Sequence, residues 1–308
     1  MKQQALLKFI SRLFIAFGVL LINLFLFSII AEYTCTFFYQ ISISEFLSTI
    51  NLAKPNTNEI NALRLFQGLV SIGTFIFSSL ILALIFKQKP LEYLGLRHFP
   101  NRIYLLLVPC LLLISMPLLS WLIELNGQLT LPSFMAGVEN TLKAIEAKNE
   151  KMYAIMLTMT SYDHLIANIF VMALIPAIGE ELFCRGVLLN IYYDYSGKFI
   201  KSVIIVALIF TLFHMQVYKF IPMMALAILL GLLIGWTQSI WASILFHFLN
   251  NTMAVIGSYY NQKGIKNFMT DNHEHVPYVL TLFSFLLTVA LIAWITKFAK
   301  RQTQIIHE

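Results

Sequence analysis

The organisation of this chain follows from residues 165–190, LIANIFVMALIPAIGEELFCRGVLLN. The segment is long and apolar enough for a membrane-spanning helix, yet it contains Glu180, Glu181 and Arg185 within little more than one helical turn. Each charge near the centre of a membrane helix costs roughly 2.5–3.5 kcal/mol, so three uncompensated charges would cost about 7–10 kcal/mol. Ionisable residues that are this unfavourable inside a membrane segment indicate a functional site.

Local spacing predicts different environments for the three charges. Glu181 and Arg185 are four residues apart, so their side chains share one helix face and can form an ion pair. Glu180 points about 100° away around the helix and is left as an unpaired carboxyl group. Pro176 frees the carbonyl of Met172 and predicts a kink just ahead of the carboxylates. The alternative is a purely structural ion pair beside a protonated glutamate.

The composition indicates that much of the surface faces lipid. Of the 308 residues, 59% are hydrophobic and 12% are charged, whereas soluble domains carry about 25% charged residues. The basic residues flank apolar segments and form no patch of the kind that binds nucleic acid, so no nucleic-acid partner is expected. Three scattered cysteines, Cys35, Cys110 and Cys184, are too few for a disulfide framework or a CxxC metal site.

The sequence predicts an all-α, polytopic integral membrane protein with about eight transmembrane helices around an intramembrane polar site. The fifth and sixth segments are short and nearly continuous, so one of them is expected to be tilted or only partly embedded. The predicted segments are Leu13–Ala31, Leu65–Phe86, Ile103–Ile123, Leu165–Tyr192, Val203–Tyr218, Phe220–Trp236, Ile240–Tyr260 and Val276–Thr296.

Charge asymmetry predicts the orientation. Of the 21 basic residues, 12 fall on the side of the termini, eight on the opposite side, and Arg185 lies within a span. This Lys/Arg bias puts both termini in the cytoplasm, and we expect the location to be a bacterial cytoplasmic membrane. The 12 residues are Lys2, Lys8, Arg12, Lys87, Lys89, Arg97, Arg102, Lys198, Lys201, Lys297, Lys300 and Arg301.

Three connecting segments have distinct compositions. Asn51–Arg64 is polar and predicts a loop on the outside. Lys87–Arg102 mixes charge with Leu and Tyr and predicts a segment along the inner membrane interface. Thr130–His164 is the longest connection, and an amphipathic helix is predicted over Val138–Met156, either as a lid or as a surface cap.

Two histidines lie in other apolar segments, His214 in FTLFH and His247 in FHFLNN. His247 and Asn251 are four residues apart and project from one helix face. Phe210 lies one turn before His214 and is predicted to pack beside it. A lone histidine on an apolar face is usually a packing residue. Two of them in a chain with a buried, unpaired carboxyl group favour a functional site.

Four residues, Glu180, His214, His247 and Asn251, form the candidate catalytic set, carried by three helices. A carboxylate can take a proton from a water that a histidine holds, while a second histidine and an amide donate hydrogen bonds to an oxyanion. This set can hydrolyse an amide bond at membrane depth. Other intramembrane peptidases fit less well, because the chain has no HExxH, GxS or GxGD motif.

Zinc or another divalent metal is possible, although no metal is favoured. If a metal is bound, the ligands would be Glu180, His214 and His247. Zinc catalysis usually needs three good ligands and a separate base. No base would then remain, because Asn251 cannot take a proton and Glu181 is committed to Arg185. A second cluster of residues could in principle hold a metal, but it lies in a short polar stretch that is predicted to be a solvated loop. These residues are Asp271, His273, Glu274 and His275.

The motifs resemble those of the CAAX protease and bacteriocin-processing (CPBP, or Abi) intramembrane endopeptidases, which are related to the Ras-converting enzyme of eukaryotes. The family motifs EExxxR, FxxxH and HxxxN correspond to Glu180–Arg185 (EELFCR), Phe210–His214 (FTLFH) and His247–Asn251 (HFLNN). Each motif alone is weak, whereas the ordered triple on a polytopic membrane protein is strongly specific. The resemblance covers roughly residues 160–260.

The resemblance implies that Glu180 activates water with His214 as its partner, and that His247 and Asn251 stabilise the oxyanion. The Glu181–Arg185 pair would support the site. Eukaryotic members remove the last three residues of prenylated proteins, and bacterial members are linked to peptide maturation, self-immunity and surface-protein processing. The expected partners are therefore the lipid bilayer and a membrane protein or peptide substrate.

The expected domain organisation is a single membrane domain over residues 1–308. Residues 1–130 hold the first three helices, residues 160–260 form the catalytic core, and residues 276–308 hold the last helix and a basic tail. With these boundaries His214 falls in the opposite half of the membrane from Glu180 and His247. We expect the fourth helix to run past the membrane, so that the fifth enters late and His214 reaches the site.

Two other functions are compatible with this pattern. The first is a non-catalytic membrane partner or immunity protein that uses the same fold to bind another membrane protein. The second is a small-solute transporter whose buried glutamate and histidines relay protons. The intact set of three motifs argues against the first, and proton-coupled uptake in vesicles would distinguish the second from a peptidase.

Overall fold

The computed structural model describes residues 2–49, 55–86, 89–130, 132–265 and 276–307, and every regular element in these ranges is a helix. The predicted all-α class is therefore confirmed. The α-helices are α1 (Lys2–Tyr39), α2 (Ile43–Thr49), α3 (Thr57–Ser71), α4 (Ser78–Ile85), α5 (Pro90–Tyr93), α6 (Tyr104–Gly127), α7 (Ala136–Met156), α8 (Tyr162–Asn168), α9 (Ile175–Glu181), α10 (Leu189–Ser196), α11 (Phe199–Phe213), α12 (Phe220–Thr237), α13 (Ile240–Gln262) and α14 (Tyr278–His307). Three π-helical turns and two 3₁₀ turns complete the set: η1 (Ile72–Phe77), η2 (Ser133–Met135), η3 (Ile169–Leu174), η4 (Leu182–Leu188) and η5 (Val217–Lys219).

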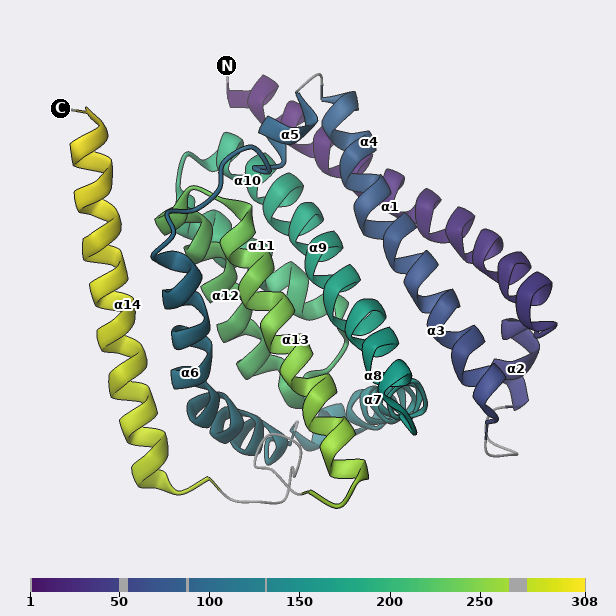
Figure 1. Cartoon of the computed structure of the whole chain (residues 1–308). Helices are drawn as coiled ribbons and strands as arrows, with labels where there is room; N and C mark the ends of the chain where they lie inside the picture. Colours follow the sequence, from purple (N-terminus) through teal and green to yellow (C-terminus); the bar gives the residue numbers. More distant parts are fainter. Residues whose placement is uncertain (1, 50–54, 87–88, 131, 266–275, 308) are drawn as a thin grey trace.

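The helices form a bundle with three parts (Figure 1). On one side, α1 packs against the continuous run of α3, η1 and α4, and on the other side α14 lies beside α6. The run from α8 to α10 lies between them with α11, α12 and α13. In the described residues, seven helices are long and apolar enough to cross a membrane, and α11 is a shorter apolar helix of 15 residues. The protein is thus a polytopic membrane protein, as predicted.

The second spanning helix begins earlier than predicted. The sequence predicted a loop over Asn51–Arg64, whereas α3 starts at Thr57, so the end of that prediction was wrong. Asn56 and Glu59 form a capping box, which satisfies backbone N–H groups at the helix start. Arg64 is tolerated inside the bundle because its guanidinium donates to the carbonyl oxygens of Met156 and Thr158.

The run from α8 to α10 is the longest continuous helix of the central part, with 35 residues. At about 1.5 Å per residue it is about 52 Å long, and the hydrocarbon core of a membrane is roughly 30 Å thick. The run is therefore longer than the hydrocarbon core is thick, so part of it extends beyond the hydrocarbon. The fifth helix, α11, begins at Phe199, so the predicted start at Val203 was wrong. The late entry of this helix into the membrane stays a prediction.

The shortness of α11 is what brings His214 to the depth of Glu180. The predicted segment Val203–Tyr218 was wrong at its end, because the helix stops at Phe213 and His214 is its C-cap residue. Met215 has a positive φ of 51°, which is incompatible with continuing the helix. The chain then forms η5 and enters α12.

Close packing between α11 and α12 depends on small residues. Ala227, Gly231 and Gly235 are spaced by four, a pattern that predicts close approach of a neighbouring helix. A Cβ atom on Gly231 would lie 2.7 Å from Val203 Cγ1, and one on Gly235 would lie 2.6 Å from Phe199 Cε1. Larger side chains at these positions would push α11 away and displace His214 at its end.

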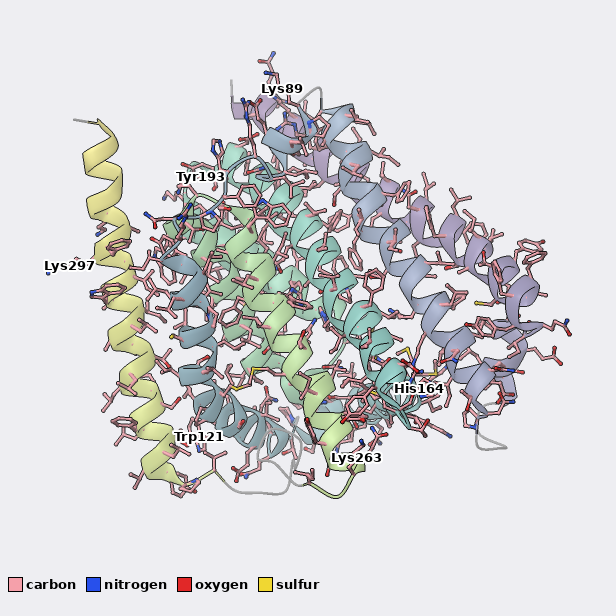
Figure 2. The ribbon with its side chains drawn as sticks, in the orientation of Figure 1. Lys89, Trp121, His164, Tyr193, Lys263 and Lys297 are labelled. Carbon is pink, nitrogen blue, oxygen red and sulfur yellow. The ribbon has the colours of Figure 1, made fainter. Side chains whose placement is uncertain are left out.

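The outer helices and the two ends of the bundle fit a membrane environment. Large apolar side chains are exposed along α1 and α14, as expected for surfaces that contact lipid. Both termini lie at one end of the bundle, and α7 lies at the opposite end (Figure 1). Figure 2 shows Lys89 near the end with the termini, and His164 and Lys263 at the other end.

This arrangement predicts the result of a labelling experiment. In a Cys110→Ser background, Lys2→Cys and Ile306→Cys are each expected to resist an impermeant maleimide in intact cells, because the Lys/Arg bias predicts that this end faces the cytoplasm. Lys148→Cys, on an exposed position of α7 at the other end, is expected to react. Labelling of only one terminal cysteine would indicate an odd number of spans, and reversal of the whole pattern would indicate the opposite orientation.

Candidate active site

The two adjacent glutamates lie between two widened turns of one helix. Glu180 and Glu181 end α9, which is preceded by the π turn η3 and followed by the π turn η4. Pro176 is the second residue of α9, so the disturbance predicted at this proline coincides with a π turn immediately before it. π turns inside α-helices occur frequently at functional sites.

Glu181 and Arg185 form the predicted ion pair. Arg185 Nη1 lies 2.9 Å from Glu181 Oε1, and the two side chains are 1% and 0% exposed. Arg185 Nη2 donates to the carbonyl oxygen of Ala227 at 3.0 Å. The guanidinium also lies over the ring of Phe210, 4.8 Å from its centroid. These contacts satisfy a charge that would otherwise be strongly unfavourable inside the bundle.

His247 is a second partner of Glu181, a contact that helix spacing did not predict. His247 Nδ1 lies 2.9 Å from Glu181 Oε1 although the residues are 66 positions apart. An ionised carboxylate only accepts hydrogen bonds, so Nδ1 carries a proton. The other ring nitrogen, Nε2, lies 3.8 Å from Glu180 Oε2. Glu181 therefore orients His247 towards Glu180.

His214 is oriented in a similar way by its own helix. Its Nδ1 lies 2.8 Å from the carbonyl oxygen of Phe210, and a carbonyl oxygen only accepts, so Nδ1–H is the donor. In the neutral ring Nε2 is then an acceptor. This atom lies 3.8 Å from Glu180 Oε2. Phe210 packs beside His214 as predicted, with ring centroids 4.5 Å apart.

Glu180 is the carboxyl group on which both histidines converge. Its Oε2 is buried and accepts no hydrogen bond from the part of the chain that the structure describes. The Glu180 side chain is 16% exposed, whereas the Glu181 side chain is fully buried. Of the two carboxylates, only Glu180 can be reached by water or by a substrate.

Asn251 lies one turn beyond His247 on α13 and is half-buried. Its Oδ1 accepts a hydrogen bond from Asn250 Nδ2 at 3.3 Å, which leaves its own N–H groups as donors. Among the described residues, no hydrogen bond or ion pair joins Asn251 to Glu180. The structure thus brings five of the six candidate residues together. Glu181 contacts Arg185 and His247 at 2.9 Å, and Glu180 lies 3.8 Å from His214 and from His247. Asn251 shares a helix with His247, but in the described part of the chain it is not joined to this group by a contact of this kind.

The metal ligands named from the sequence are Glu180, His214 and His247, whose facing atoms are Glu180 Oε2 and the two Nε2 atoms. A metal bound by these atoms would use Glu180 itself as a ligand. Within the described ranges, no group of three His, Cys, Asp or Glu side chains is arranged to hold a metal ion. The acidic and histidine-rich loop of the sequence, Asp271, His273, Glu274 and His275, lies outside the described residues.

Comparison with known proteins gives one match. A family model described as type II CAAX prenyl endopeptidase, Rce1-like, matches residues 162–253. This segment begins with α8 and ends within α13, so it contains all six candidate residues. No curated protein and no solved structure matches the chain. The matched segment also carries the three ordered motifs on helices of a membrane bundle, and the match supports an assignment to the CAAX protease family.

Proposed function

We propose that this protein is an intramembrane endopeptidase that hydrolyses a peptide bond of a membrane-associated protein or peptide, with Glu180 as the base that activates water. One observation carries the proposal. Glu180 Oε2 is buried without a hydrogen bond and lies 3.8 Å from the Nε2 atoms of both His214 and His247. A carboxylate kept free beside two oriented histidines is the arrangement that general base catalysis requires.

The first step is activation of water between Glu180 and His214. The 3.8 Å separation of their facing atoms is too long for a direct hydrogen bond, and in this proposal one water molecule hydrogen bonds to both in the working enzyme. Glu180 takes a proton from this water, and the resulting hydroxide attacks the carbonyl carbon of the peptide bond. When the carbon–nitrogen bond breaks, Glu180 returns the proton to the leaving amine nitrogen.

The oxyanion that forms during attack needs hydrogen-bond donors, which His247 and Asn251 supply in this proposal. With Nδ1–H held by Glu181, His247 can donate from Nε2 only as an imidazolium.

A metal would remove the base on which this reaction depends. If Glu180 and both histidines ligated zinc, Glu181 would have to act as the base. Its side chain is fully buried, and its Oε1 already accepts from Arg185 and His247. The neutral amide of Asn251 cannot take a proton. We therefore propose a metal-independent reaction.

The test is cleavage by purified protein in lipid vesicles. The probe is a fluorogenic peptide that ends in a prenylated cysteine followed by three residues. The protein is expected to cleave it, and to retain its rate after dialysis against a strong chelator. Near-stoichiometric zinc whose removal stops cleavage, and whose return restores it, would contradict the metal-independent reaction but not the peptidase proposal. Cleavage in neither condition would count against this substrate class.

A further inference from the structure

The predicted amphipathic helix between the third and fourth spans is present as α7, which crosses the end of the bundle opposite the termini (Figure 1). Glu139, Glu146 and Tyr153 follow one another on α7 at intervals of seven residues. Seven residues are nearly two full turns, so these three side chains lie on one face of the helix. Two members of this face, Glu139 and Glu146, contact Tyr218, four residues after His214.

The first two members of this face bind the chain segment that follows His214. Tyr218 Oη donates to Glu139 Oε1 at 3.0 Å, and the Tyr218 backbone N–H donates to Glu146 Oε2 at 3.4 Å. Lys219 Nζ pairs with Glu150 Oε1 at 3.0 Å. Tyr218 and Lys219 belong to η5, which begins three residues after His214. The same face of α7 therefore lies along the segment that leaves the site.

The end of α7 is fixed to the helices that carry the site. The carbonyl oxygen of Met156 accepts hydrogen bonds from Arg64 on α3 and from Asn168 on α8. Asn168 precedes the turns that lead to Glu180, and Met152 packs in one cluster with Met172 of η3. Tyr153 is therefore held between two anchored positions, Glu150 and Met156.

The electrostatic environment of Tyr153 agrees with this placement. The side chain is 44% exposed, so it can be reached by solvent and by a substrate. The surrounding helices nevertheless desolvate the phenol, and this burial, with a smaller contribution from the charge of Glu180, raises the pKa of Tyr153 above its ordinary value. The phenol keeps its proton at neutral pH and is available as a hydrogen-bond donor.

We propose that Tyr153 is a further residue of the site, which hydrogen bonds through its hydroxyl to the backbone of the peptide substrate beside Glu180. This inference rests on the proposed peptidase function. It makes α7 a wall of the substrate site, and it makes the end of the bundle that carries α7 the side on which the substrate is held.

The first test is Tyr153→Phe, which keeps the ring and removes the hydroxyl. For the prenylated fluorogenic peptide, KM is expected to rise about 3- to 10-fold with kcat nearly unchanged, as for the loss of one neutral hydrogen bond made to the bound substrate. Tyr162→Phe, an exposed tyrosine on α8 at the same end, is the matched control and should leave both constants unchanged. Unchanged KM and kcat in Tyr153→Phe would overturn the proposal.

The second test does not depend on cleavage. In a Glu180→Gln, Cys110→Ser background, Tyr153→Cys is expected to react with a maleimide more slowly when the prenylated peptide is present. Lys148→Cys, on an exposed position away from the face that carries Tyr153, should react at the same rate with and without the peptide. Equal rates for Tyr153→Cys would overturn the proposal. Failure of the peptidase function itself would be recognised separately, because wild-type protein would then not cleave the peptide in a Glu180-dependent way.

Discussion

Glu180→Gln is expected to abolish peptide cleavage while leaving the protein folded. The amide has the shape of the carboxyl group but cannot take a proton from water, and loss of a general base typically costs about 10²–10⁴ in rate. Stability should be unchanged or slightly higher, because Glu180 Oε2 is buried without a hydrogen bond. The measurements are kcat for the fluorogenic peptide, the yield of purified protein and its thermal unfolding in detergent.

The control for this substitution is Glu92→Gln, which removes the same charge from an exposed ion pair at the end with the termini. It should change neither cleavage nor yield. A comparison of membrane proteomes from cells with wild-type protein and with Glu180→Gln would reveal substrates that accumulate uncleaved. Full biological function of Glu180→Gln would instead support a non-catalytic membrane partner, and proton-coupled solute uptake by vesicles would support a transporter.

Arg185→Ala is expected to lower stability and yield more than any change at Glu180. The substitution leaves Glu181 fully buried without its arginine, and it removes the donor to the Ala227 carbonyl oxygen. Breaking a buried ion pair by removing one partner typically costs about 3–5 kcal/mol in the free energy of unfolding. The expected result is a lower yield of folded protein and a lower midpoint of thermal unfolding in detergent.

Two variants test the cause of this loss. Arg97→Ala removes an arginine from an exposed ion pair and should cost at most about 1 kcal/mol. Adding Glu181→Ala to Arg185→Ala should restore part of the yield, because the fully buried carboxylate that lost its arginine is then removed as well. It should not restore activity, because His247 loses its orienting partner. If Glu180→Gln reduced the yield more than Arg185→Ala, the assignment of the paired carboxylate would be wrong.

Much of the local structure follows from the sequence because it depends on spacing within one helix. The Glu181–Arg185 pair and the packing of Phe210 beside His214 are both separated by four residues, and both are present. The start of α3 was also encoded locally, in the Asn56–Glu59 capping box. It was missed because the first turns of α3 are as polar as a loop, and hydropathy alone does not distinguish the two.

The sequence by itself determined the membrane location, the helical class and the residues of the candidate site. Long apolar segments need lipid around them, and charges inside such segments are too unfavourable to persist without a role. Only the tertiary structure decided that Glu181 orients His247, that both Nε2 atoms face Glu180 Oε2, and that α7 binds the segment after His214 through Glu139. Helix periodicity fixes which residues share a face, but not which faces meet. The crossing of α9, α11 and α13 sets those contacts, and the π turns on both sides of Glu180 shift the register that an ideal helix would give.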